Sequence, residues 1–174
     1  MEPLDGYGII PIKDNIVGSQ QKISDEYLAG FLDGDGSIVA TLERYHSSRF
    51  PYRVRIKVNF TQHARHLQFL VRVKKILGGV GAIRVNKRKA LAELVVQERN
   101  QVQEILLRLG PQLVIKRKQA VLGIKVLKIL SANRKHQPSN LSADAYKRVL
   151  LLVQNIRDMN SNSGGKRPSK MITV

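Results

Sequence analysis

Two stretches of the chain alternate between apolar and polar residues, which is the pattern of a strand with one buried face. The first is residues 37–45 and the second is residues 52–60. The apolar positions on the buried face would be Ile38, Ala40, Leu42, Val54, Ile56, Val58 and Phe60. Because a short loop containing Pro51 separates the two stretches, we predict that they pair as antiparallel strands.

Helical spacing of apolar residues and short flanking turns identify the remaining elements. The predicted helices cover residues 24–34, 64–79, 100–111, 116–130 and 143–159, and two further strands cover residues 80–86 and 90–96 around the basic turn 87–89. Ser24 and Ser142 are good N-caps, and Gly110 with Pro111 ends the third helix. The order predicts an α+β fold, with an αββαββα core, a four-stranded antiparallel sheet and additional C-terminal helices.

The length and composition suit one packed domain. The chain has 174 residues, of which 43% are hydrophobic and none is cysteine, so disulfides and cysteine-ligated metals are excluded. We place the domain at residues 23–160, after an N-terminal arm (1–22) and before a flexible basic tail (161–174). Neither a membrane span nor a targeting signal is recognisable, so we expect a soluble, intracellular protein without a membrane partner, in the cytoplasm, nucleoid or an organelle matrix.

The charge balance narrows the choice of partner. Lysine and arginine number 30 against 13 aspartates and glutamates, which gives a formal net charge of +17. An excess of this size favours a polyanionic partner, most often nucleic acid. Aromatic residues, on which single-stranded RNA stacks, make up only 5% of the chain, and this favours duplex DNA over RNA.

A basic face lines the predicted sheet. The polar positions of the first three strands and the turn after them supply Thr41, Arg53, Arg55, Lys57, Asn59, Arg84, Asn86, Lys87 and Arg88. Such a face could simply be solvated, but charges of one sign on adjacent strands would also form a cationic saddle able to enter a DNA major groove. Glu43 is the exception on this face, because its carboxylate could either accept from a cytosine amine or point outward at the strand end.

The first helix ends in acids and glycines, which is unfavourable because the carboxylates face the negative end of the helix dipole. Asp33 and Asp35 could form salt bridges there, but a breach of local rules is also where a functional site is expected. Ala29 and Gly30 precede Asp33 and Gly34 by four residues, a spacing of small residues that lets two helices approach closely. A two-fold axis there would bring two Asp35 carboxylates together as a Mg²⁺ site.

The segment LAGFLDGDG, residues 28–36, closely resembles the signature of the LAGLIDADG homing endonucleases, and the order of elements in residues 24–131 resembles their core fold. The resemblance implies that the Asp35 carboxylate and the Gly34 backbone carbonyl bind the catalytic metal. Because the motif occurs once, the chain resembles the homodimeric group of the family. The implied dimer interface consists of Ala29, Gly30, Asp33 and Gly34.

The same resemblance suggests two more catalytic residues. Gln62 would organise metal-bound water, and Lys116 would polarise water or stabilise charge on the phosphate, with Lys118 contacting DNA. Each has a simpler interpretation, since Gln62 could cap the next helix and the basic run at 116–118 could be a solvated helix start. His66 falls where the family has an arginine, and His63 and His66 could bind zinc only with a third ligand.

The residues and the resemblance together predict a homodimeric endonuclease that cuts both strands of a long, pseudo-palindromic duplex DNA. It would use Mg²⁺, for which Mn²⁺ or Ca²⁺ could substitute in binding, and no small-molecule cofactor. The family implies short 3′ overhangs and a mobile, intron-encoded origin. Two rival functions on the same fold are an RNA-binding intron-splicing maturase and a DNA-binding regulator without catalysis. A rival without catalysis would more often lack one of Asp35, Gln62 or Lys116.

Overall fold

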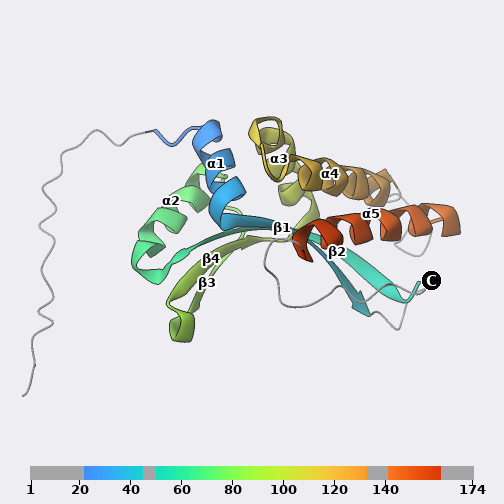
Figure 1. Ribbon diagram of the computed structural model, residues 1–174, viewed down its shortest axis with the longest axis horizontal. Coiled ribbons are helices and arrows are strands. Elements are labelled where there is room, and N and C mark those ends of the chain that lie inside the picture. Colours follow the sequence, from blue (N-terminus) through green and yellow to red (C-terminus); the bar gives the residue numbers. More distant parts are fainter. Residues whose placement is uncertain (1–21, 45–49, 133–140, 162–174) are drawn as a thin grey trace, which may run out of the picture.

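A computed structural model of the chain describes residues 22–44, 50–132 and 141–161 (Figure 1). Apart from residues 22 and 161, the predicted N-terminal arm and basic tail lie outside these ranges. None of the described helices has the length and apolar character that crossing a membrane would require. The extent of the domain, residues 23–160, therefore stays a prediction at both ends.

Four antiparallel strands form one curved sheet, as the alternating pattern predicts (Figure 1). The strands are β1 (Gly36–Arg44), β2 (Tyr52–His63), β3 (Ala82–Asn86) and β4 (Leu91–Val96), in the spatial order β1-β2-β4-β3. In the β1–β2 register Thr41 lies opposite Arg55, and in the β3–β4 register Arg84 lies opposite Glu93. Since opposed residues share a face, these pairs fix which side chains lie together.

Five α-helices accompany the sheet in the described ranges. They are α1 (Asp25–Asp35), α2 (Leu67–Ile76), α3 (Arg99–Leu109), α4 (Arg117–Ala132) and α5 (Ala143–Ser161). The predicted caps are present, because Ser24 Oγ accepts from the Tyr27 backbone N–H and Ser142 Oγ from that of Ala145. The predicted helix 64–79 begins instead as the 3₁₀ turn Ala64–His66, and its α-helical part, α2, ends at Ile76 before the left-handed glycines Gly78 and Gly79.

The helices pack on one face of the sheet, and the core lies between the two layers (Figure 1). The strands alternate accordingly, since Val54, Ile56, Val58 and Phe60 of β2 are buried while the residues between them are at least partly accessible. In the described part of the chain no helix covers the opposite face of the sheet, which carries the basic residues. The helices and strands of the described ranges therefore leave the cationic side of the saddle open.

The two ends of α1 are held in different ways. At its start, Asp25 forms an ion pair with Arg108 of α3 (Oδ1 to Nη2, 2.6 Å), and this hydrogen bond lowers the pKa of the Asp25 carboxyl. At its end the chain passes directly into β1 through Gly36. A Cβ on Gly36 would lie 2.8 Å from the backbone oxygens of Leu32 and Asn59. Only glycine lets the end of α1 approach β2 so closely, and this places the last residue of α1, Asp35, beside that strand.

Candidate active site

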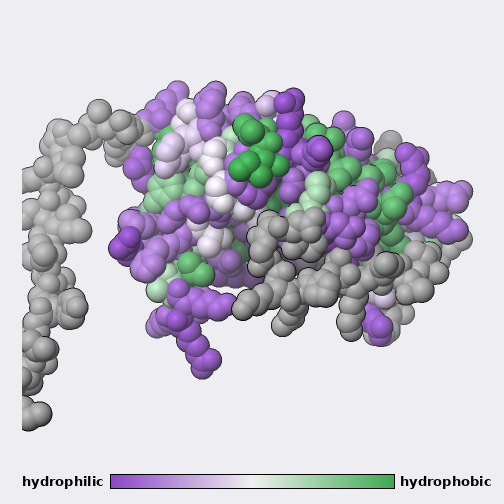
Figure 2. All heavy atoms as spheres, in the orientation of Figure 1, coloured by the Kyte–Doolittle hydropathy of each residue, from purple (hydrophilic) through white to green (hydrophobic). Residues whose placement is uncertain are grey.

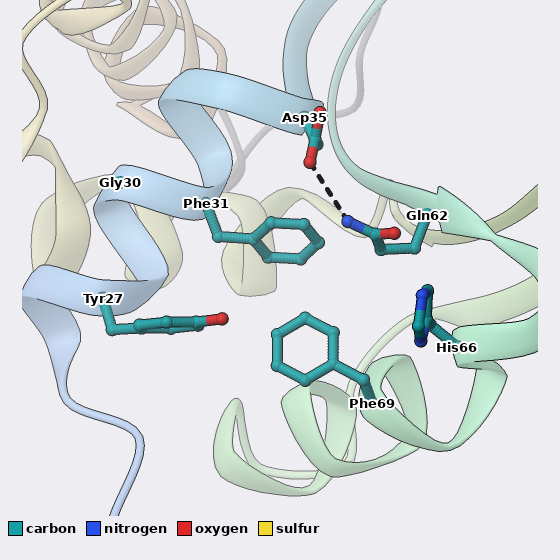
Figure 3. A pocket seen from close by; sticks show the side chains of 7 residues that line it. All are labelled: Tyr27, Gly30, Phe31, Asp35, Gln62, His66 and Phe69. Atoms are coloured by element: carbon teal, nitrogen blue, oxygen red, sulfur yellow. Dashed lines mark hydrogen bonds between the residues drawn. The ribbon is translucent and has the colours of Figure 1, made fainter.

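The last residue of α1 and a residue near the end of β2 meet at the point where β1 begins. The Gln62 side-chain Nε2 donates to the Asp35 carboxylate Oδ2 at 3.1 Å (Figure 3). Both side chains line an open cavity of about 620 Å³, and Asp35 is exposed. Two of the three predicted catalytic residues are thus in direct contact although 27 positions separate them.

The amide group of Gln62 is oriented from both ends. While its Nε2 donates to Asp35, its Oε1 accepts from the His63 backbone N–H at 3.2 Å. The cap of the following 3₁₀ turn is His63, whose Nδ1 accepts from the Arg65 backbone N–H at 3.2 Å. Gln62 is therefore not a helix cap in this structure, and its amide is directed toward the carboxylate.

Aromatic side chains form one wall of the cavity (Figure 3). The ring of Phe31 on α1 stacks on Phe60 of β2 (centroids 5.5 Å apart) and meets Phe69 of α2 edge-on (5.1 Å). Tyr27, one turn earlier on α1, also meets Phe69 edge-on, at 6.1 Å. Edge-to-face and stacked ring pairs fix orientation as well as bury area, so these rings hold α1 against β2 and α2. None of these rings was among the predicted site residues, although the spacing of Tyr27 and Phe31 is helical.

His66 also lines the cavity (Figure 3). Its Nε2 accepts from Arg65 Nε at 3.1 Å. His63 is exposed and is engaged in capping. Among the described residues, no group of three histidine, cysteine or acidic side chains is arranged to hold a metal ion. No third ligand therefore joins the two histidines in this part of the chain.

Asp33 binds within its own chain. Although it lies in the last turn of α1, it is only 8% exposed. Its Oδ2 accepts from the backbone N–H groups of Val114 (2.6 Å) and Ile115 (3.2 Å), and its Oδ1 accepts from that of Lys116 (2.9 Å). These groups precede the first turn of α4, where a negative charge is favourable. The carboxylate that is unfavourable for α1 thus stabilises the start of α4.

Lys116 adds a further hydrogen bond between the start of α4 and the end of α1, with its side chain as the donor. Its Nζ donates to the backbone carbonyl of Asp33, where a cation at the C-terminal end of α1 favours the helix dipole. Lys116 is not among the residues that line the cavity. The structure therefore brings this predicted catalytic residue to the last turn of α1, near Asp35 along the chain, but does not show it in contact with the Asp35 carboxylate.

Substitution of Asp33 by alanine is expected to destabilise the fold by about 2–4 kcal/mol, because three backbone N–H groups would lose a charged acceptor. Asp33→Asn, which retains one acceptor oxygen, should cost less than the alanine variant. Urea unfolding at equal protein concentration measures both. An Asp33→Ala free energy of unfolding within about 0.5 kcal/mol of wild type would show that this connection is unimportant for stability.

The predicted basic residues of the strands share the open face of the sheet, whereas Lys87 and Arg88 lie in the turn after β3 and Lys118 lies on α4. These residues are not equally available. Arg53, Arg84, Asn86, Lys87, Arg88 and Lys118 are exposed, and Arg55, Lys57 and Asn59 are half-buried. The oxygens Thr41 Oγ1 and Asn59 Oδ1 are buried and have no hydrogen-bond partner among the described residues. Arg55 Nε donates to Glu43 Oε2 at 2.6 Å. The register adds two residues to this face that were not predicted for it, Thr61 and Glu93.

The small residues of α1 divide between two faces of the helix. Ala29 is fully buried in the core of its own chain, so its methyl group is inaccessible to a second subunit, as is most of Asp33. Gly30 and Gly34 are exposed, and a Cβ on either would meet nothing within 4 Å. Of the four residues predicted for a dimer interface, only these two glycines lie on the outer surface.

A hydrophobic surface adjoins the end of α1. Val114 and Ile115, whose N–H groups bind Asp33, are 85% and 72% exposed. Figure 2 shows strongly hydrophobic surface beside α1, in the region where α3 ends and α4 begins. Exposed apolar side chains grouped in this way are typical of an interface. The signal in the sequence was an apolar pair immediately before a basic run.

Comparison with known proteins agrees with this geometry. Residues 28–122 match the model of the LAGLIDADG endonuclease family. The DNA endonuclease I-CreI of Chlamydomonas reinhardtii is 29% identical over 146 residues, which is 84% of either chain. The DNA endonuclease I-CvuI of Chlorella vulgaris is 30% identical over 144 residues, 76% of this chain and 86% of that protein.

Solved structures of I-CvuI superpose on most of the chain. A complex of I-CvuI with the I-CreI target in the presence of Mg, in which the DNA is not cleaved, covers 83% of this chain with a TM-score of 0.70 and 27% identity. A complex with its own target in the presence of Ca covers 85%, also with a TM-score of 0.70. The family match includes α1 from Leu28 onward, the whole sheet and the start of α4. The chain belongs to the LAGLIDADG endonuclease family.

Proposed function

We propose that the protein is a site-specific homing endonuclease that hydrolyses both strands of a long, pseudo-palindromic duplex DNA. The observation that carries this proposal is the Asp35–Gln62 pair, an exposed carboxylate oriented by an amide at the edge of an open, basic sheet face. The similarity to I-CreI and I-CvuI, both DNA endonucleases, supports the same function. Family membership further suggests short 3′ overhangs and an intron-encoded origin.

The open face of the sheet is suited to the major groove. Its curvature and its predominantly positive charge match the shape and potential of duplex DNA, and arginine and asparagine can read guanine and adenine there (Figure 1). In this arrangement Arg53, Arg55 and Asn59 contact base edges. The exposed cations of the 87–89 turn, Lys87 and Arg88, and Lys118 at the start of α4 contact phosphates.

The donor atoms at the end of α1 fit a divalent metal only in part. The Asp35 carboxylate is an oxygen donor of the kind that Mg²⁺ prefers, and the Gly34 carbonyl would be a second one. One described chain offers a single carboxylate at this place, so the fit improves if a second subunit contributes its own Asp35. When bound, Mg²⁺ would supply Lewis acidity that stabilises negative charge on phosphate oxygens and promotes ionisation of water.

The other residues of the site have roles that do not depend on a bound metal. Gln62, held by the His63 N–H, orients the Asp35 carboxylate and presents an amide to water in the cavity. Lys116 keeps a positive charge at the last turn of α1, which favours the approach of a phosphate. Phe31 and Phe69 exclude water from one wall, which strengthens electrostatic interactions at the site.

The proposed assembly is a homodimer joined through the outer face of α1. Gly30 and Gly34 present no side chain, so a second helix could approach closely, and the exposed Val114 and Ile115 would be buried beside it. Each subunit would then cover one half-site with its sheet, which makes the target symmetric. The two copies of Asp35 would lie near the two-fold axis, one for each DNA strand.

Incubation of the full chain with a library of randomised duplexes and Mg²⁺, followed by sequencing of the cleaved ends, tests the proposal. We expect a selected pseudo-palindromic site and cleavage of both strands. Selective binding without cleavage in Mg²⁺ or Mn²⁺ would indicate the regulator instead. Preference for a structured intron RNA over every duplex would indicate the maturase.

A further inference from the structure

Glu43 is an acid on a face that is otherwise suited to DNA, and it has a specific partner. In the β1–β2 register it lies directly opposite Arg53, yet its Oε2 accepts from Nε of Arg55, 2.6 Å away. Arg55 itself lies opposite Thr41, so the ion pair crosses the strands diagonally. The carboxylate has therefore paired with one of two arginines within its reach.

Stability does not explain this pair. The side chains of Arg55 and Glu43 are 32% and 43% exposed, and ion pairs with this much contact with water contribute little to folding. A carboxylate on the sheet face also repels the phosphates of approaching DNA. The pair therefore weakens the general attraction to DNA without a compensating gain in stability. What it does fix is the orientation of the Arg55 guanidinium.

The geometry of this hydrogen bond leaves the two terminal nitrogens of the Arg55 guanidinium available to contact a base. Because Nε is the donor to Glu43, the two terminal nitrogens of the guanidinium remain for another acceptor. Those nitrogens form the fork that binds guanine O6 and N7 in the major groove. A guanidinium already held in one plane loses less rotational freedom on binding than a mobile one, so each hydrogen bond to the base counts for more.

We propose that Glu43 is a positioning residue for DNA recognition, which holds the Arg55 guanidinium so that it reads one guanine in each half-site. This inference rests on the proposed function and adds to it the source of selectivity at one base pair. It also changes the interpretation of Glu43, whose Oε2 is occupied by Arg55 and which therefore orients a reading residue instead of reading cytosine itself.

Site selection from a randomised duplex library, with the full chain in Ca²⁺, is the test. The wild-type protein should select guanine at one symmetric pair of positions, and Arg55→Ala should abolish that preference, a loss of roughly 5- to 150-fold. Glu43→Ala should lose most of the preference at the same positions while its overall affinity for DNA rises. The double variant should be no less selective than Arg55→Ala, because both changes remove one shared contact.

Glu93→Ala is the matched control, since Glu93 lies on the same face opposite Arg84 and its removal changes the charge equally. It should raise general affinity in the same way and leave the preference at the Arg55 positions unchanged. Wild-type preference in Glu43→Ala would overturn the inference, as would a changed preference at a position where Arg55→Ala has no effect. If the wild-type protein selected no duplex at all, the proposed function itself would fail and this inference with it.

Discussion

Replacement of Asp35 by asparagine is expected to lower the rate of DNA cleavage by at least ~10³-fold, about 4 kcal/mol of transition-state stabilisation, with little loss of DNA binding. Asparagine retains an oxygen that can accept from Gln62 Nε2, so the local geometry of the pair should survive. What is lost is the negative charge, and a neutral amide is a much poorer ligand for a divalent cation. The variant therefore separates chemistry from folding and binding.

Single-turnover cleavage of the selected duplex in Mg²⁺ measures this loss, and a gel-shift titration in Ca²⁺ measures binding. Asp144→Asn makes the same charge change at an exposed position in the first turn of α5, and its cleavage rate should stay within about twofold of wild type. Cleavage by Asp35→Asn at the wild-type rate would mean that another group performs the chemistry. Equal loss of binding and cleavage would point to a recognition defect.

The element order was predictable from the sequence because each element has a local signature. Alternation over residues 37–45 and 52–60 reflects a sheet that is buried on one face only. The structure confirms both strands, the first as far as Arg44, since residue 45 lies outside the described ranges. Ser24 and Ser142 cap helices by accepting a hydrogen bond from a backbone N–H three residues later, so this signal is local. The family signature then suggested that Asp35 and Gln62 belong to one site, and the structure shows them in contact.

The contacts that the sequence could not supply are those between distant segments. Asp33 binds N–H groups 81 to 83 positions away, and nothing near residue 33 indicates that these donors will be presented to it. The pairing of Glu43 with Arg55 depends on side-chain direction across two strands, whereas the register alone would favour Arg53. The exposure of Val114 and Ile115 follows from the same long-range docking of the α4 start onto α1.

The glycines and acids at the end of α1 have different roles on different faces of the helix. Leu28 and Leu32 bury one face in the core, while Asp33 on the inner side secures the start of α4. Gly30 and Gly34 leave the outer side without side chains. An isolated helix would be weakened by the two glycines and by Asp33. The compensation comes from packing, from the α4 donors and, in the proposed dimer, from a second α1.

Substitution of Gly30 by leucine is expected to raise the dimer dissociation constant by at least ~100-fold, about 2.7 kcal/mol, and to abolish double-strand cleavage. In the described chain nothing lies within 4 Å of a Cβ at this exposed position, so the subunit has room for the start of a side chain there. Leucine should even stabilise the isolated subunit by about 0.5–1 kcal/mol, since it favours the helix more than glycine does. Across a two-fold axis, however, two leucines would have to fit where two backbones approach.

Sedimentation over a range of protein concentrations measures the association, and urea unfolding of the dissociated variant measures the stability of the subunit. Ala132→Leu, at the exposed last position of α4, adds the same side chain at the end of that helix remote from α1 and should leave association unchanged. A dimer of wild-type affinity in Gly30→Leu would place the interface elsewhere. A less stable monomer would instead show that α1 itself is disturbed. Replacing an interface glycine should weaken association while the subunit becomes more stable, whereas replacing a structural glycine should weaken both.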